Sequence, residues 1–220
     1  MQRRIREKCG LRGVVPLVRH SKRLKHVLDR AVALGALPWV VPPFLGIALA
    51  IKLEDLVTGE DPLCSVFYRE ERYSQGAPFQ LVKFRVLKHS VLQERFRQGY
   101  TSIKGLEHDP DAVTCVGRLL VKYYLDELPQ WFHVLAGRMS LVGPRPVWPS
   151  DTQRREYFAR FRIKAGLAGT FQLAKGEGDI FDLDKVYLER YAEETPLGLL
   201  RYDLEVLWKT LRKMRQGEGL

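Results

Sequence analysis

The sequence predicts an α/β protein: a small, mainly helical domain with short strands, anchored by an N-terminal helix–break–helix segment that enters a membrane and returns to the same face. Three observations lead to this prediction. Residues 31–51 carry no charge but are interrupted by prolines. Short apolar runs separated by Gly and Pro follow in residues 67–85, a pattern typical of a hairpin. Apolar residues at helical spacing then recur in residues 128–135 and 200–211.

The 220 residues suit one compact domain with an attachment. The formal net charge is +10, and the first 30 residues hold ten Lys/Arg against two acidic residues. The basic charge therefore belongs mostly to an N-terminal arm, whose first part we define as residues 1–21. Such an arm suits anionic lipid or nucleic acid. No nucleic-acid-binding motif accompanies the charge, so nucleic acid is not an expected partner.

Residues 22–53 form the expected membrane segment. The 21 uncharged residues reach roughly 30 Å as a helix, which also allows a simple transmembrane helix or a soluble core helix. Pro38, Pro42 and Pro43 interrupt the stretch, and a proline disfavours helical geometry in the residue before it. Basic residues flank both ends, which conflicts with a crossing under the positive-inside tendency. A re-entrant helix–break–helix removes that conflict.

Residues 67–85 predict a strand, a turn and a second strand. Lys83 and Arg85 flank Phe84, so in a strand both basic side chains would face the same side. They are either solvated charges of an edge strand or ligand contacts. The polar residues 86–112 predict a helix and a variable loop without a chemical role. The three cysteines are scattered, which supports neither a disulfide framework nor a zinc site and fits a reducing cytoplasm.

Asp126 and Glu127 are adjacent carboxylates before an apolar helix face formed by Leu128, Trp131, Phe132 and Leu135. Asp126 is a candidate N-cap, and that role alone would explain it. Adjacent carboxylates are also suited to holding a divalent cation, and a helix N-terminus gathers phosphate.

Arg145 follows about twenty residues later, between two prolines, and can grip phosphate with its planar fork. Farther along, aromatic and basic residues interleave in residues 154–162, and leucines at helical spacing lie beside Lys and Arg in residues 200–215. Each of these two segments is either an interfacial amphipathic helix or an ordinary packed helix.

These motifs resemble the bacterial sugar transferases, which are monotopic polyprenyl-phosphate glycosyl-1-phosphate transferases. The resemblance rests on Leu125–Gln130 and Met139–Pro146, together with Lys83–Arg85 and Gly117–Arg118. It covers roughly residues 22–212 and corresponds to the short form of the family, without extra N-terminal membrane helices.

The resemblance implies a bacterial inner-membrane enzyme whose catalytic domain, residues 54–220, lies on the cytoplasmic face. It would transfer a sugar-1-phosphate from a nucleotide sugar, expected to be a UDP-sugar, to polyprenyl phosphate, with Mg²⁺ as cofactor. Asp126 would form a covalent phosphosugar intermediate, and Glu127 would help to hold the metal or position Asp126. The implied metal ligands are Asp126 and Glu127, the implied phosphate contacts are Lys83, Arg85, Arg118 and Arg145, and the implied break in the membrane helix is Val41–Pro42.

The chain departs from the family pattern on the side expected to recognise the donor. Arg138 replaces the usual Asp, Ala165 replaces a proline, and residues 174–177 differ from the usual small-Gly-Arg run. These changes leave an alternative, a catalytically impaired membrane-bound scaffold of the same fold. The intact pair of Asp126 and Glu127 favours the enzyme.

Overall fold

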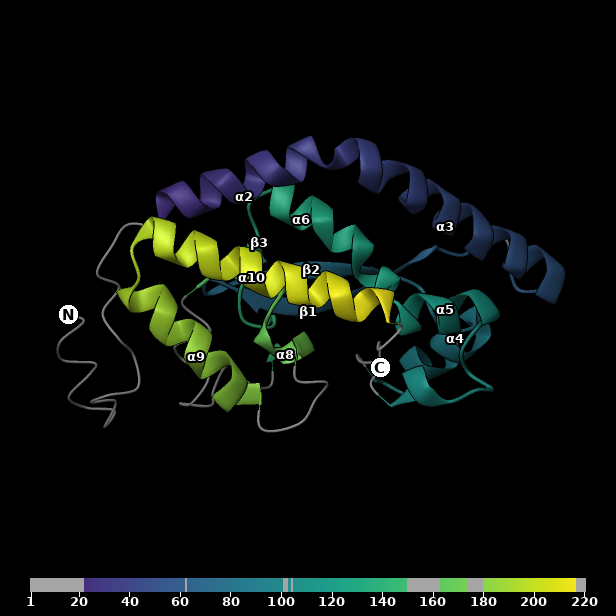
Figure 1. Cartoon of the computed structure of the whole chain (residues 1–220). Coiled ribbons are helices and arrows are strands. Elements are labelled where there is room, and N and C mark those ends of the chain that lie inside the picture. The colour runs from purple at the N-terminus through teal and green to yellow at the C-terminus, as the bar shows by residue number, and fades with distance from the viewer. Residues whose placement is uncertain are drawn as a thin grey trace.

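The computed structural model describes residues 22–61, 63–100, 103, 105–149, 163–173 and 180–216. The predicted basic arm and the aromatic-basic segment 154–162 lie outside these residues. The described part is mainly helical, with two small two-stranded sheets (Figure 1), as the sequence predicts.

Two N-terminal helices, α2 (Arg23–Gly35) and α3 (Leu37–Thr58), form an arch over the rest of the chain (Figure 1). Their axes differ by 61°. Of the described helices, none is by itself both long and apolar enough to cross a bilayer, whereas the bent pair together meets that requirement. The predicted helix–break–helix is therefore present as a bent helix pair.

The predicted position of the break, Val41–Pro42, is wrong. The break lies at Ala36, and both Val41 and Pro42 are inside α3. Pro42 and Pro43 lie inside α3, beyond its first four residues, so each removes one N–H donor from the helical ladder. The helix nevertheless continues through both prolines, whose fixed φ suits helical geometry.

The strands β1 (Phe67–Ser74) and β2 (Ala77–Phe84) form the predicted antiparallel hairpin. Gln75 and Gly76 connect them with φ values of 52° and 79°. Two consecutive residues with positive φ make the type I′ turn that matches the twist of a tight hairpin.

The next segment contains α4 (His89–Arg97), the 3₁₀ helix η1 (Leu106–His108), α5 (Cys115–Lys122), the 3₁₀ helix η2 (Leu125–Gln130) and α6 (Trp131–Leu135). The single helix expected after the two carboxylates is thus divided into η2 and α6. Pro129 lies within η2 and has no N–H to donate to the α-helical ladder.

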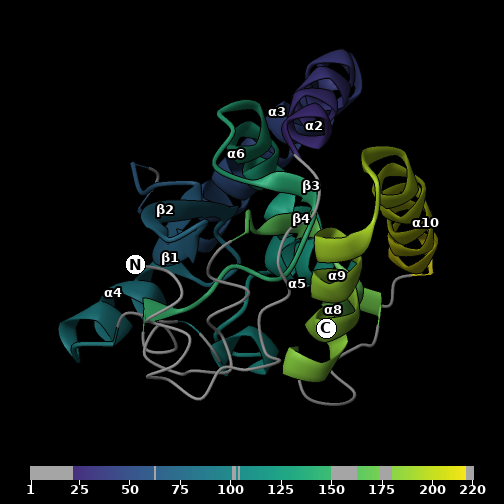
Figure 2. The same ribbon diagram turned by 90° about the vertical axis from the view of Figure 1, so that its left-hand side faces the viewer.

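The chain then forms β3 (Ser140–Val142) and β4 (Gly166–Ala168), which pair in parallel, followed by α8 (Thr170–Leu173), α9 (Ile180–Glu193) and α10 (Pro196–Arg215). Figure 2 shows the hairpin on one side of the domain, α9 and α10 on the other, and the arch above both. Along α10, Leu199 and Val206 are buried, whereas Leu204, Trp208 and Leu211 are exposed. This helix therefore packs one face against the domain and exposes apolar side chains on another.

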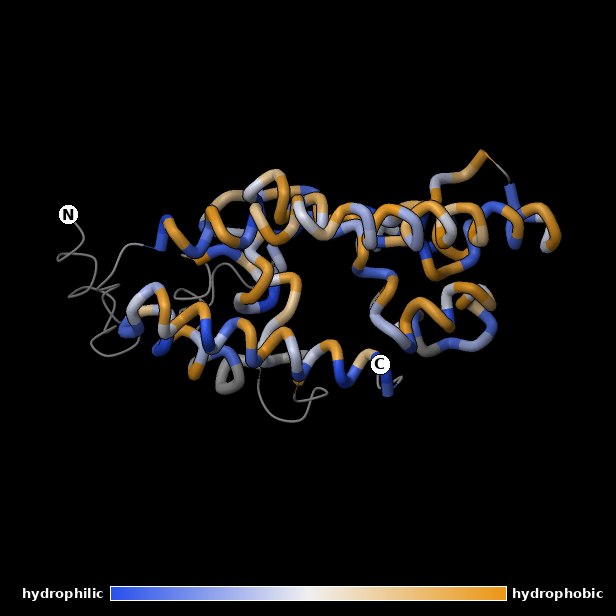
Figure 3. The backbone as a smooth tube through the Cα atoms, turned by 45° about the horizontal axis from the view of Figure 1, so that its top comes forward, coloured by the Kyte–Doolittle hydropathy of each residue, from blue (hydrophilic) through white to orange (hydrophobic). Residues whose placement is uncertain are grey.

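Both helices of the arch contribute to the core. Ala33 of α2 packs in one buried cluster with Val134, Val142 and Leu199, and Ile51 of α3 packs in a second cluster around Phe84. The rest of the arch is apolar along its middle (Figure 3). Its exposed apolar residues are Leu24, Val27, Val32, Leu34, Trp39, Leu45, Leu49, Leu53, Leu56 and Val57.

Buried polar contacts also join the arch to the domain. The Lys25 ammonium of α2 lies 2.6 Å from Asp203 of α10. The Glu54 carboxylate of α3 accepts hydrogen bonds from the backbone N–H groups of Cys115 and Val116 at the start of α5. A carboxylate at that end satisfies unpaired donors and complements the helix dipole.

Candidate active site

The 3₁₀ helix η2 carries the two adjacent carboxylates, Asp126 and Glu127. Tyr124 precedes it with φ 57° and ψ 21°, the left-handed region that non-glycine residues rarely adopt. This sharp turn directs the chain from α5 into η2. Asp126 is only 8% exposed, so its carboxylate needs compensating contacts.

Lys83, the penultimate residue of β2, supplies the compensating charge. Its ammonium nitrogen lies 3.0 Å from Glu127 Oε1 and 3.4 Å from Asp126 Oδ2. Burial alone would lower the pKa of Lys83, but the charges of Glu127 and Asp126 outweigh burial and raise it. Lys83 is therefore a cation shared by both carboxylates.

The pKa values of the two carboxylates are shifted in opposite directions. Burial raises the pKa of Asp126 to about 6, and Lys83 only partly opposes this effect, since the charges of Glu127 and Glu107 reinforce it. Burial also acts on Glu127, but Lys83 and Arg145 outweigh it, so the pKa of Glu127 is lowered. At neutral pH both groups are mainly ionised, and Asp126 is the one that takes up a proton first.

The interpretation of Asp126 as a helix N-cap is wrong. The N-cap of η2 is Tyr124 and that of α6 is Gln130, and neither makes a side-chain capping hydrogen bond. The Asp126 carboxylate accepts a hydrogen bond from Lys83 instead. Its burial beside a cation therefore has no capping explanation.

Arg145 lies near Glu127 and Lys83. It lines a small polar cavity together with Lys83, Glu127, Gln130 and other residues of β1 and β4. The loop that carries Arg145 is held by the mutual hydrogen bonds of Tyr73 and Val147.

The same loop also approaches β4 very closely. A Cβ atom on Gly166 would lie 2.1 Å from the nitrogen of Gly143, so both positions require glycine. The loop that carries Arg145 is therefore closely packed against β4.

Arg85 does not belong to this group, which corrects its predicted role as a phosphate contact. Its side chain is 1% exposed and lies under α3, where Nη2 is 2.6 Å from Asp55 Oδ2. It also donates to the carbonyl oxygens of Ser65 and Leu87. The alternation that would pair it with Lys83 ends because β2 stops at Phe84.

Arg118 is also outside the group. It lies on the exposed side of α5, and its guanidinium contacts Cys115 Sγ at 3.2 Å. Buried Gly117 faces the core in its place, because α5 packs against the backbone carbonyl of Val86. Within the described residues, no hydrogen bond or ion pair joins Arg118 to Asp126 or Glu127.

Sequence reasoning missed three residues that line the cavity: Glu70, Arg72 and Gln130. All three are nearly inaccessible to solvent. Glu70 and Arg72 occupy alternate positions of β1 and so face the same side, which is the side that the strand buries. Two charged residues at i and i+2 of a predicted strand indicate that both lie on one face, and this was the signal that could have identified Glu70 and Arg72.

The two carboxylates supply oxygen atoms of the kind that Mg²⁺ prefers. Among the described residues, no three or more His, Cys, Asp or Glu side chains gather into a cage for a metal. Mg²⁺ commonly takes one or two protein carboxylates and fills its remaining positions with water and substrate phosphates. Asp126 and Glu127 converge on one cation, Lys83, and supply that oxygen set.

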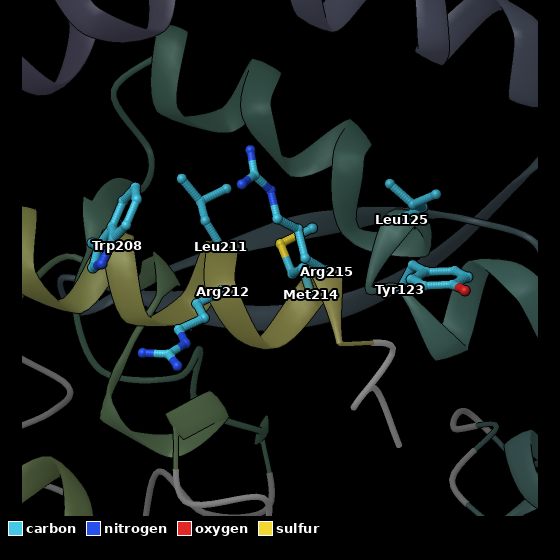
Figure 4. Close-up of a pocket in the computed structure, with 7 residues that line it drawn as sticks. All are labelled: Tyr123, Leu125, Trp208, Leu211, Arg212, Met214 and Arg215. Carbon is cyan, nitrogen blue, oxygen red and sulfur yellow. The ribbon is translucent and has the colours of Figure 1, made fainter.

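An apolar groove of about 630 Å³ adjoins the other side of η2. Its residues are Tyr123, Leu125, Trp208, Leu211, Arg212, Met214 and Arg215. Figure 4 shows the side chains of α10 on one side of the groove and those of Tyr123 and Leu125 on the other. Leu125, which lines this groove, directly precedes Asp126 in η2.

Comparison with known proteins gives this site a context. The profile of the bacterial sugar transferase family matches residues 20–217. Exopolysaccharide production protein ExoY of Sinorhizobium fredii is 33% identical over 211 residues, covering 90% of this chain and 87% of that protein.

Two further relatives carry names that state a reaction. A UDP-glucose:undecaprenyl-phosphate glucose-1-phosphate transferase of Caulobacter vibrioides is 36% identical over 206 residues, covering 90% of this chain and 72% of its own. A UDP-N-acetylgalactosamine-undecaprenyl-phosphate N-acetylgalactosaminephosphotransferase of Aeromonas hydrophila is 32% identical, covering 89% of this chain and 44% of its own. Relatives with similar identity thus have names that state different sugars.

Proposed function

The chain belongs to the bacterial sugar transferase family, and on that basis we propose that it transfers a sugar-1-phosphate from a UDP-sugar to a polyprenyl phosphate such as undecaprenyl phosphate. The products are a polyprenyl-diphosphate-sugar and UMP, and the reaction would begin the membrane assembly of a glycoconjugate. The observation that carries the proposal is the buried contact of Lys83 with both Asp126 and Glu127 beside Arg145.

The proposed reaction has two steps. A carboxylate oxygen of Asp126 attacks the β-phosphorus of the donor, the bond from that phosphorus to the oxygen of UMP breaks, and UMP leaves with the electron pair. An oxygen of the lipid phosphate then attacks the same phosphorus and releases the Asp126 carboxylate. A covalent intermediate of this kind lets one site serve a soluble substrate and a lipid substrate in turn.

The surrounding residues support these steps electrostatically. Lys83 keeps Asp126 ionised despite its burial, and Lys83 and Arg145 together offer cationic donors to the diphosphate. Glu127 holds Lys83 at 3.0 Å and so orients it between the carboxylates. Asp126 and Glu127 would also bind Mg²⁺, which when bound neutralises diphosphate charge and makes UMP a better leaving group.

The apolar surfaces of the protein are suited to contact with the membrane and with the lipid acceptor. We infer that the arch of α2 and α3 lies in the cytoplasmic face of the inner membrane, since its middle is uncharged and its outer residues are exposed and apolar. The apolar groove along α10 is suited to an isoprenoid chain, and Arg212 and Arg215 at its rim are suited to phosphate.

A direct assay tests the function. The purified protein in detergent is incubated with Mg²⁺, undecaprenyl phosphate and each of a panel of radiolabelled UDP-sugars, and label is followed into the organic phase. We expect transfer from one donor and release of UMP. No transfer from any nucleotide sugar by a folded protein would support the alternative, a scaffold that has lost turnover.

A further inference from the structure

Arg72 in β1 is a buried cation with an incomplete set of partners. Its side chain is 4% exposed, and its Nε and Nη2 atoms donate to Glu70 Oε1 at 3.1 Å and 2.6 Å. Its third nitrogen, Nη1, is buried and has no hydrogen-bond partner. Buried polar groups are nearly always paired, because an unmade hydrogen bond loses about 1–3 kcal/mol.

The place of Arg72 shows what kind of partner is missing. Arg72 lines the same cavity as Lys83, Glu127 and Arg145. The cavity has a volume of about 20 Å³, which is room for one oxygen-sized atom. The plane of the guanidinium packs on the Trp148 ring, so its orientation is fixed.

The charges around Arg72 favour an anion. Burial lowers the pKa of Arg72 to about 10, Glu70 opposes this effect, and the charge of Arg145 reinforces it. Two guanidinium groups and the ammonium of Lys83 therefore meet at one cavity, with Glu70 and Glu127 as the opposing charges. An incoming anion would relieve the repulsion between Arg72 and Arg145.

We propose that Arg72 is a further substrate-binding residue, whose Nη1 donates to a phosphate oxygen of the nucleotide-sugar donor beside Arg145. Guanidinium groups match phosphate with several N–H donors in one plane. Glu70 holds one edge of the guanidinium and leaves the Nη1 edge for the ligand. This inference rests on the proposed function.

The assignment to the donor follows from the position of the two cavities. The polar cavity is lined by residues of β1, β2, β4, η2 and the Arg145 loop, and none of them lines the apolar groove of α10. A diphosphate suits the charged cavity, and an isoprenoid chain suits the apolar groove. Arg72 lines the polar cavity, so we assign it to the donor.

The test measures UDP binding to the full-length protein in detergent by calorimetry, with uridine as the phosphate-free control. UDP carries both phosphates of the donor but no sugar to transfer. We expect Arg72→Gln to weaken UDP binding at least tenfold and to leave uridine binding unchanged. Because Arg72→Gln leaves the buried Glu70 carboxylate with Tyr68 as a hydrogen-bond donor but without its cation, the double variant Glu70→Gln/Arg72→Gln is measured beside it. It should fold and show the same loss.

The single variant Glu70→Gln gives an effect of opposite sign. It removes a negative charge beside the cavity that would hold the phosphate, so UDP should bind several-fold more tightly. If the pair only stabilises the hairpin, or if a buried water satisfies Nη1, the Arg72 variants will leave the Kd for UDP within twofold of the wild type. Either that result or weaker UDP binding by Glu70→Gln overturns the inference.

Two outcomes distinguish a failure of this inference from a failure of the proposed function. A wild-type protein that binds neither UDP nor any UDP-sugar contradicts the proposed function itself. A wild type that binds UDP and turns over, with Arg72 variants that raise only the KM for polyprenyl phosphate, overturns the assignment to the donor.

Discussion

The Arg85 guanidinium lies 2.6 Å from Asp55 Oδ2, and both side chains are 1% exposed. This pair fastens the end of the hairpin to α3, the second helix of the arch. It also separates two basic residues that are only two positions apart in the sequence. Lys83 faces the carboxylates of η2, whereas Arg85 is committed to the arch.

Substitution of Arg85 should lower the stability of the protein, whereas substitution of Arg145 should lower its catalytic rate. Arg85→Met leaves Asp55 buried without its partner, which typically destabilises a protein by about 3–5 kcal/mol. We expect a large fall in melting temperature. Arg145→Lys should melt like the wild type but lose at least about tenfold in rate, which is ~1.4 kcal/mol, because it keeps the charge and loses the bidentate fork. A stable Arg85→Met enzyme with a reduced rate would return Arg85 to the phosphate site.

Asp126→Asn should abolish turnover without unfolding the protein. The change keeps the size of the side chain and removes the attacking oxygen. Wild-type enzyme given donor and Mg²⁺ but no lipid acceptor should gain the mass of one phosphosugar, and Asp126→Asn should not. Glu127→Gln should lose less activity, since an orienting role is partly replaceable. Turnover by folded Asp126→Asn would leave direct attack by the lipid phosphate as the mechanism.

The rate should depend on the protonation of Asp126. Since burial raises the pKa of Asp126 to about 6, kcat/KM should fall about tenfold per pH unit below that value, as the carboxylate becomes protonated. Glu107 contributes to the raised pKa by its charge. Glu107→Gln should therefore move the inflection to lower pH. Glu94→Gln, at an exposed position of α4, is the control and should leave it unchanged. An unmoved inflection in Glu107→Gln would assign the titration to another group.

Both ends of the arch should lie on the cytoplasmic side. Single cysteines at Arg23, the first residue of α2, and at Leu63, after the end of α3, are placed in a background without Cys9, Cys64 and Cys115. Leu63 is 91% exposed, so its replacement disturbs little packing. We expect an impermeant maleimide to label neither site in intact cells and both after permeabilisation. Labelling of the Arg23→Cys site alone would establish a crossing.

The groove along α10 should affect the acceptor and not the donor. Trp208→Ala removes an exposed aromatic wall, so the KM for undecaprenyl phosphate should rise several-fold. Formation of the covalent intermediate from donor alone should be unchanged. Leu197→Ala removes an exposed apolar side chain from the same helix outside the groove and serves as control. Equal effects of both variants would show that α10 acts only as a general membrane contact.

The parts of the fold that depend on neighbouring residues in the sequence were predictable. The hairpin has its Gln75–Gly76 turn, and the uncharged stretch with prolines forms a bent helix pair. The position of the bend was not predictable from proline alone. α3 continues through Pro42 and Pro43, and the chain breaks at Ala36 instead.

Only the residues that belong to recognisable sequence motifs could be assigned to the site from sequence. Asp126, Glu127, Lys83 and Arg145 come together as expected. Arg85 was misassigned because its partner, Asp55, lies in the arch 30 residues away, and a sequence pattern does not report such a long-range ion pair. Arg72 was missed because its importance arises from one buried nitrogen without a partner.

The contact of Lys25 with Asp203 has a consequence for how the protein is made. These residues are 178 positions apart, and they join the first described helix to the last. At ~5–20 residues per second, a ribosome needs roughly 10–35 s to reach Asp203 after it has passed Lys25. During that interval Lys25 and the apolar helices α2 and α3 have been synthesised, but α10, which pairs with Lys25, has not. Early docking of α2 and α3 at the bilayer would shield them from aggregation, and completion of α10 would then lock the whole enzyme in a single late event.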